Sequence, residues 1–233
     1  HIKYGIRSNA CFILRVQNNT FNQCEIGVSA RKYGTNMSSA SYILSNNFED
    51  NYIAIQTDGE NTRIYRNNIN RQSPDPFSYR WYNGYVTAGI LLRASSFAVG
   101  NTPGIMPLDN FIDNVTFGIL PISNYSLGGS IKNNHLANSA ASVFALGNNK
   151  NVEIKCNDLH NYQLFGLGLA AWNTEQGHLD QQGECYVIPP KPAGNSFIPA
   201  PPQIVYTDLW RDELNSEGFV YEDINTTSLT ASP

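Results

Sequence analysis

The chain has 233 residues, with 19 acidic and 15 basic side chains, a formal net charge of −4 and a hydrophobic content of 41%. The mild acidity and the absence of Lys/Arg clusters argue against a nucleic-acid-binding surface. No apolar run reaches the ~18 residues that a membrane span needs. The length suits a single elongated β domain, and no motif points to a cofactor.

A short motif recurs along the chain: Asn or Asp, then any residue, then a large apolar residue. Its copies are Asn19-Thr-Phe21, Asn46-Asn-Phe48, Asn67-Asn-Ile69, Asp109-Asn-Phe111, Asn134-His-Leu136, Asn157-Asp-Leu159 and Asn195-Ser-Phe197. Short apolar stretches with a small middle residue often follow, as in Ile26-Gly-Val28, Ile53-Ala-Ile55, Ala88-Gly-Ile90, Phe117-Gly-Ile119 and Phe165-Gly-Leu167. The small residue is expected to fit a tight point in the core.

The spacing of the motif indicates a stacked repeat fold. Successive copies are 27, 21, 42, 25, 23 and 38 residues apart, and periods of roughly 20 to 50 residues are typical of solenoids. The step of 42 suggests two coils, one without the Asn signature, and the step of 38 suggests one coil with an insertion. The segments are short and rich in Val, Ile, Phe and Tyr, which favours strands over helix pairs. The string typical of leucine-rich repeats is absent.

We therefore predict an all-β fold, a right-handed parallel β-helix of about seven to nine coils with lateral loops and a C-terminal polar cap. Asn tolerates the positive φ that corners need, and its side-chain amides can stack as a ladder along the axis. The apolar residues expected to stack inside are Phe21, Phe48, Ile69, Phe111, Leu136 and Leu159. An Asn-rich loop protein with chance periodicity is the alternative.

We expect residues 1–203 to form the β-helix and residues 204–233 to form a cap strand followed by a tail or linker. The motif is already running near the start, so further coils or a cap are expected before His1. The opening residues lack the pattern of a signal peptide. Asp58-Gly-Glu60 is either a calcium-binding turn or a solvated one.

Residues 71–85, RQSPDPFSYRWYNGY, break the period and read as a lateral insertion. Their aromatic rings and cations suit stacking on sugar rings, unless the rings fold down and cover the flank of the sheet. The candidate glycan-binding residues are Tyr79, Arg80, Trp81, Tyr82 and Tyr85. Further along, His135 and His160 lie near successive corners, either as a metal-binding or proton-relay pair or as exposed corner residues.

Four cysteines are present, at Cys11, Cys24, Cys156 and Cys185. They permit two disulfides, and the preferred arrangement pairs Cys11 with Cys24 and Cys156 with Cys185. Four buried free thiols are the alternative. The spacing of these cysteines does not favour zinc.

The repeats over residues 4–170 resemble right-handed parallel β-helix proteins of the pectate-lyase-like fold. The C-terminal stretch resembles the end of secreted Bacteroidetes β-helix proteins that use the type IX secretion route. The residues that carry this second resemblance are Cys156-Asn157-Asp-Leu159, Gln182-Gly183, Ala193-Gly194-Asn195-Ser196-Phe197 and Gly218-Phe219-Val-Tyr221. The resemblance implies a secreted or cell-surface location and contact with secretion machinery.

The catalytic motifs of galacturonan hydrolases of this fold do not occur here, and the chain shows no acidic cluster with a nearby Arg of the kind pectate lyases use. The leading hypothesis is therefore a non-catalytic segment of a larger protein that presents loops to a glycan or another cell-surface ligand. A polysaccharide lyase or glycoside hydrolase with part of its site outside this chain is the alternative. A trimeric tailspike is a third hypothesis.

Overall fold

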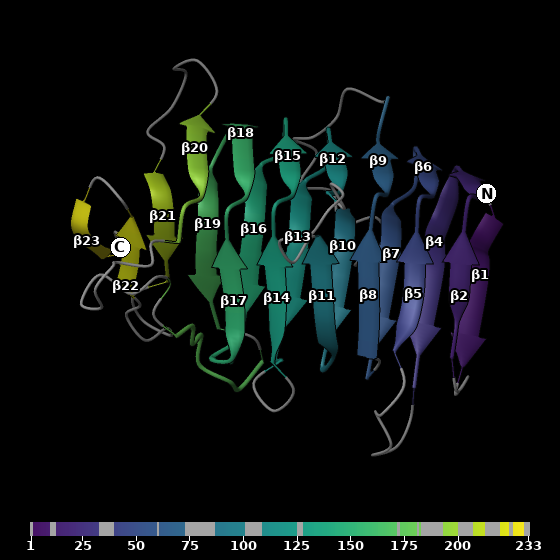
Figure 1. The fold of residues 1–233 in the computed structure, drawn as a ribbon, viewed down its shortest axis with the longest axis horizontal. Helices are drawn as coiled ribbons and strands as arrows, with labels where there is room; N and C mark the ends of the chain where they lie inside the picture. The colour runs from purple at the N-terminus through teal and green to yellow at the C-terminus, as the bar shows by residue number, and fades with distance from the viewer. Residues whose placement is uncertain are drawn as a thin grey trace, which may run out of the picture.

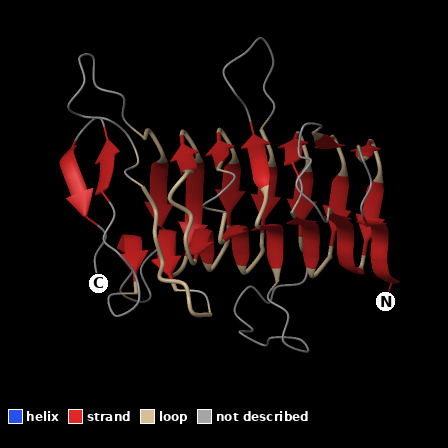
Figure 2. Cartoon of the chain, turned by 90° about the horizontal axis from the view of Figure 1, so that it is seen from below, coloured by secondary structure: helices blue, strands red, loops and turns tan. Residues whose placement is uncertain are grey.

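The computed structural model describes residues 2–9, 13–32, 40–59, 61–72, 87–100, 109–124, 128–171, 173–180, 182, 193–199, 207–212, 220–223 and 226–230. These residues form strands and connections, with no helix among them (Figure 2). Apart from one small antiparallel pair, the strands belong to three parallel sheets, which we name A, B and C.

Apart from that antiparallel pair, successive strands belong to different sheets. Sheet A holds β1 (Ile2–Asn9), β4 (Cys24–Arg31), β7 (Ile53–Asp58), β10 (Ala88–Arg93), β13 (Phe117–Ile122), β16 (Ala141–Leu146), β19 (Phe165–Ala170) and β21 (Thr207–Arg211). Sheet B holds β2 (Arg15–Gln17), β5 (Ser41–Leu44), β8 (Asn61–Tyr65), β11 (Ser96–Gly100), β14 (Gly129–Lys132) and β17 (Val152–Lys155). Sheet C holds β3 (Thr20–Asn22), β6 (Asn47–Glu49), β9 (Asn68–Asn70), β12 (Phe111–Asp113), β15 (His135–Ala137), β18 (Asp158–Tyr162) and β20 (Ser196–Pro199).

From β1 to β19 the chain visits A, B and C in turn, and we call each such passage a repeat; the last described passage runs from β19 in sheet A to β20 in sheet C. Each strand pairs with the strand of the same sheet in the repeats before and after it, so the strands stack along the long axis of the molecule (Figure 1). This arrangement is compatible with the predicted parallel β-helix. Beyond it, β22 (Val220–Asp223) and β23 (Thr226–Thr230) form a separate antiparallel pair.

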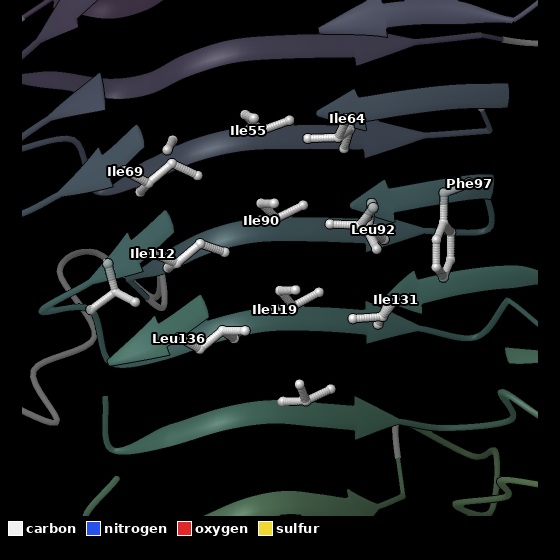
Figure 3. Packing of buried hydrophobic residues seen from close by; sticks show 14 of the residues in the cluster. Ile55, Ile64, Ile69, Ile90, Leu92, Phe97, Ile112, Ile119, Ile131 and Leu136 are labelled. Carbon is white, nitrogen blue, oxygen red and sulfur yellow. The ribbon is translucent and has the colours of Figure 1, made fainter. Parts of the chain in front are cut away.

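The core runs between the three sheets as columns of aliphatic side chains. Ile69, Ile112 and Leu136 follow one another in sheet C, because their Cα positions are paired between neighbouring strands (Figure 3). Ile90 and Ile119 do the same in sheet A. All five side chains are almost completely buried. Regular burial of this kind supplies the main favourable free energy of folding.

A second column, made of asparagine amides, runs through the corner between sheets B and C. Its members are Asn19, Asn46, Asn67, Asn110, Asn134, Asn157 and Asn195. Each Nδ2 donates to the Oδ1 of the next member at 2.9 to 3.3 Å. Every member except the exposed Asn19 is buried. The predicted amide ladder is therefore confirmed.

The ladder also satisfies the polar backbone of the corner. The Asn134 Nδ2 donates to the carbonyl oxygens of Val99 and Lys132, each at 3.1 Å. The Asn134 backbone N–H donates to the Asn157 Oδ1, also at 3.1 Å. Since unpaired buried polar groups are costly, one amide per repeat is what allows this turn to be buried.

The positive φ that the corner needs falls on the residue before the ladder asparagine. Ser45, Arg66 and Cys156 adopt φ values of 53°, 56° and 55°, whereas the buried ladder asparagines are absent from the positive-φ set. The prediction that the repeat Asn itself absorbs this conformation was wrong. The neighbour turns the chain, which leaves the asparagine free to point inward.

Two expectations about the repeat from Asn67 to Asn134 were also wrong. The ladder residue is Asn110 rather than Asp109, so the inward position belongs to Ile112 and Phe111 points outward with 55% of its surface exposed. The long step is one repeat rather than two, because β9 pairs directly with β12. Its extra length falls in the two stretches of sequence that separate β9 from β10 and β11 from β12, residues 71–87 and 101–110. The 38-residue step is one repeat with an insertion, as predicted, since β18 pairs with β20.

The small residue of the sheet A strands has a steric reason. A Cβ built on Gly27 would lie 2.7 Å from the Phe48 ring and 2.7 Å from the carbonyl oxygen of Ala54. Side chains at these separations overlap, so the close approach of sheets A and C at this point excludes a large residue.

Replacing an interior ladder residue should destabilise the fold strongly. We expect Asn134→Ala to lower the free energy of unfolding by about 3 kcal/mol or more, because several buried groups lose partners at about 1 to 3 kcal/mol each. Asn19→Ala, at the exposed end of the ladder, should cost less than about 1 kcal/mol. Urea unfolding followed by circular dichroism measures both, and equal losses would contradict the proposed role of the ladder.

Phe48 and Phe111 should differ sharply as sites of mutation. Phe48 is 1% exposed, so Phe48→Ala should cost about 3 to 5 kcal/mol. Phe111→Ala removes an exposed ring and should change stability by less than about 0.5 kcal/mol. The same unfolding measurement compares them. A large loss for Phe111→Ala would place this ring in the core after all.

Candidate ligand-binding surface on sheet C

The outer face of sheet C is built from the first and third residues of each short strand, because the middle residue points into the core. The first positions, in order along the sheet, are Thr20, Asn47, Asn68, Phe111, His135, Asp158 and Ser196. The third positions are Asn22, Glu49, Asn70, Asp113, Ala137, His160 and Ile198. None of these strand positions is Lys or Arg, and many of them carry a carboxylate or an amide.

Phe111 is the large aromatic side chain on this face. Its ring stacks on the His135 imidazole in the next strand, with 4.8 Å between centroids and 8° between planes. The stack holds the Phe111 ring in a fixed orientation while leaving 55% of the residue exposed. A rigid, exposed aromatic plane of this kind offers an apolar surface to a flat partner.

A carboxylate lies near each of the two nitrogens of the His135 imidazole, and the one from Asp158 is within hydrogen-bonding distance. The Nδ1 lies 3.3 Å from the Asp158 Oδ2, and the Nε2 lies 3.6 Å from the Asp109 Oδ2. The other oxygen of Asp158 is bound by His160 Nε2. The four side chains are between 21% and 44% exposed, so their remaining hydrogen-bonding positions face solvent.

A row of hydrogen-bonded amides continues this surface at the corner with sheet A. The Asn138 Nδ2 donates to the Asp113 Oδ1 at 2.7 Å, and the Asn161 Nδ2 donates to the Asn138 Oδ1 at 3.2 Å. Toward the N-terminal end, the Asn68 Nδ2 donates to the Asn47 Oδ1 at 3.0 Å. These contacts pre-orient the polar groups around the Phe111 stack.

The five residues predicted from sequence as a glycan platform, Tyr79, Arg80, Trp81, Tyr82 and Tyr85, lie outside the described residues. The described base of their insertion is anchored beside the Phe111 strand. The Arg71 backbone N–H donates to the Asp113 carbonyl oxygen, and the Asn114 Nδ2 donates to the Arg71 carbonyl oxygen. Residues 101–108 lead directly into Asp109. The described ends of the two insertions, Arg71 and Asp109, therefore lie beside β12.

The structure brings together residues that sequence reasoning had treated separately. His135 and His160, named as a pair, are linked through Asp158, which was not singled out. The signal for Asp158 and Phe111 was present, because the middle residue of each Asn-x-apolar motif occupies the same outward column. Reading the motif from Asp109 instead of Asn110 assigned Phe111 to the core rather than to this outward column.

A metal centre finds no support in the described part of the chain. No group of three or more His, Cys, Asp or Glu side chains there is arranged to hold an ion. Asp58 ends strand β7 and Gly59 follows it with φ of 67°, while Glu60 lies outside the described residues. The proposed calcium turn therefore stays untested.

The cysteines divide by environment. Cys24 and Cys156 are free thiols in this structure, the first buried and the second exposed. Cys11 and Cys185, their predicted partners, lie outside the described residues, so the pairing of either with Cys24 or Cys156 stays a prediction for the oxidised protein. Burial raises the pKa of the Cys24 thiol, which lowers its reactivity because the thiolate is the nucleophile.

Comparison with known proteins finds no matching family model, no matching curated protein and no matching solved structure. Within the described residues, no helix has the length and apolar character to cross a membrane.

The two described cysteines should react at very different rates. Treating the reduced, native protein with iodoacetamide should label Cys156 quickly and leave Cys24 largely unlabelled, because Cys24 is buried and its pKa is raised. Peptide mass spectrometry with time resolves each site. Labelling in denaturant is the control and should make the two rates similar. Rapid labelling of native Cys24 would show that the N-terminal repeats open readily.

Proposed function

We propose that the chain is a segment of a right-handed parallel β-helix of about seven to nine coils, belonging to a secreted or cell-surface protein and holding a glycan-binding surface without catalysing a reaction. The exposed Phe111 ring, fixed beside His135, Asp109 and Asp158 on sheet C, is the observation that supports glycan binding. The rotation of strands through three parallel sheets supports the coil architecture. The right-handed sense follows the general preference of parallel crossovers.

The chemistry of the surface suits an uncharged sugar. One face of many sugar rings carries only C–H groups, which stack on an aromatic plane, while the hydroxyls at the ring edge seek acceptors. Carboxylates are strong acceptors of such hydrogen bonds, and Asp109 and Asp158 lie on either side of His135 next to the Phe111 ring. An anionic sugar would be repelled by these carboxylates and would meet no Lys or Arg on the described strands of this sheet.

The rigidity of the site contributes to affinity. Phe111, His135 and Asp158 lie on three successive strands, so binding orders little that is not already ordered. Stacking of one ring is worth roughly 1 to 3 kcal/mol by analogy with nucleobase stacking. A single site of this kind binds weakly, and clustering on a surface would strengthen it through avidity.

The secreted or surface location and the type IX route rest on the resemblance of the C-terminal stretch alone. The division into a β-helix over 1–203 and a cap over 204–233 is part of the same proposal. Strand β21, from the second segment, adds the last described strand to sheet A.

Polysaccharide cleavage remains the alternative function, and one observation favours it. The His135 imidazole contacts the Asp158 carboxylate and lies 3.6 Å from the Asp109 carboxylate, and a histidine oriented by a carboxylate is an arrangement that general acid–base catalysts use. An enzyme would release new reducing ends or unsaturated products from the glycan that it binds.

The test is a glycan array probed with the full chain and with Phe111→Ala. We expect binding to neutral glycans that falls about tenfold in the variant, since a loss of about 1.4 kcal/mol corresponds to a factor of ten. Asp158→Asn should weaken binding as well. Isothermal titration with the best array ligand gives the dissociation constants.

Ile198→Ala is the matched control, because Ile198 is also an exposed apolar residue of sheet C, at 46%, and lies on β20 rather than beside His135. It should bind as the wild type does. Unchanged binding by Phe111→Ala, or an equal loss by Ile198→Ala, would reject the site. Product formation abolished by His135→Ala would replace the binding proposal with the enzymatic one.

A further inference from the structure

The outer face of sheet B differs in charge from that of sheet C. One outward column reads Arg15, Tyr42, Arg63, Ala98, Ser130 and Glu153 along successive strands. The column beside it reads Gln17, Leu44, Tyr65, Gly100, Lys132 and Lys155. The face thus carries four cationic side chains and one carboxylate.

The two ends of this face use their cations differently. At the C-terminal end, the Lys132 Nζ lies 2.5 Å and the Lys155 Nζ 3.1 Å from the Glu153 carboxylate. The hydrogen bond from Lys132 lowers the pKa of Glu153 below its ordinary value, and Lys155 adds to the effect. These two cations are already partnered by a carboxylate of the protein.

At the N-terminal end, Arg15 and Arg63 lie on either side of Tyr42, on three adjacent strands. The Arg15 Nε donates to the Gln17 side-chain oxygen at 3.2 Å, a neutral partner. Among the described residues, no carboxylate forms a salt bridge with either arginine. Neighbouring strands are about 4.8 Å apart, so the two arginine backbones are about 10 Å apart.

Tyr65 joins this group. It lies on strand β8, two residues after Arg63. Burial raises the pKa of the Tyr65 phenol. The Arg63 guanidinium opposes this rise, and Tyr42 adds to it. Arg63 and Tyr42 therefore lie close enough to Tyr65 to influence the ionisation of its phenol. Tyr42 is 39% exposed, so its ring is open to a partner.

We propose that the Arg15, Tyr42, Arg63 and Tyr65 patch binds a sulfated polysaccharide. The sugar ring would stack on Tyr42, and the sulfate groups on either side of it would meet the two guanidinium groups. Each guanidinium has a further polar side chain beside it, and this mixed set of donors fits the three outer oxygens of a sulfate ester. A carboxylate has two oxygens, which one guanidinium can satisfy alone.

A polysaccharide fits this patch better than a nucleic acid. Nucleic-acid-binding proteins typically neutralise about 6 to 10 phosphates, whereas this patch offers two arginines on a protein of net charge −4. The site is separate from the Phe111 surface, so the two proposals can fail independently.

The experiment measures binding of a heparin oligosaccharide to the full chain by isothermal titration at low and moderate salt. We expect the double variant Arg15→Gln/Arg63→Gln to lose binding at least tenfold and Tyr42→Ala to weaken it. Lys150→Gln removes one positive charge, as each of the single variants Arg15→Gln and Arg63→Gln does, and it is their control because Lys150 is exposed and lies two residues before β17, three strands from β8 in the sheet. It should change binding less than twofold. Phe111→Ala should retain heparin binding.

Several outcomes would overturn the proposal. Absence of heparin binding at low salt would reject it directly, and an equal loss in Lys150→Gln would show diffuse charge attraction instead of a site. Tighter binding of polygalacturonate would assign the patch to a carboxylated ligand, and tighter binding of a single-stranded oligonucleotide would assign it to nucleic acid. Circular dichroism of each variant checks that the fold is unchanged.

Discussion

The buried asparagine column is the constraint on which the rest of this structure depends. A chain that turns sharply inside a narrow core leaves backbone groups without partners, and hydrogen bonding is required of nearly all buried backbone groups. One inward amide per repeat meets that need. The Asn157 side chain, for example, connects the Asn134 amide on one side, the Asn195 amide on the other, and the Ile131 carbonyl oxygen. The corner is thereby set at the same place in every repeat, and the apolar columns follow from it.

Much of the fold could be predicted from the sequence, because the ladder requires an asparagine at the same corner of every repeat. The asparagine and the apolar residue two positions later identify a corner and the strand after it, and the spacing identifies stacking. The assignment failed where two readings of the motif overlap, at Asp109-Asn110-Phe111-Ile112. Both Asp109 with Phe111 and Asn110 with Ile112 satisfy the pattern. An ionised Asp carboxylate accepts hydrogen bonds but cannot donate them, so it cannot bond to both ladder neighbours as an Asn amide does. For this reason Asn110, and not Asp109, occupies the ladder position.

The candidate surfaces were harder to predict from the sequence, since packing in the core does not constrain outward-facing residues. Ile112 has to be apolar, but the outward position before it tolerates Phe in one repeat, His in the next and Asp in the one after. Their adjacency in space becomes visible once the register is known, as it does for Arg15, Tyr42 and Arg63. The insertion residues Tyr79 to Tyr85 stood out by composition alone. Composition identifies unusual stretches of sequence, whereas the register of the paired strands identifies which residues are neighbours in space.

The alignment of all the parallel strands across one axis has a mechanical consequence. The strands of each sheet stack along the long axis of the molecule (Figure 1). The backbone hydrogen bonds between neighbouring strands, and the hydrogen bonds between the ladder amides, therefore run along that axis. A pull along that axis loads them in tension, and because each repeat contacts mainly its neighbours, the repeats can separate from an end one after another. Under such a load the described repeats would part stepwise rather than all at once, since each is held mainly by the one beside it.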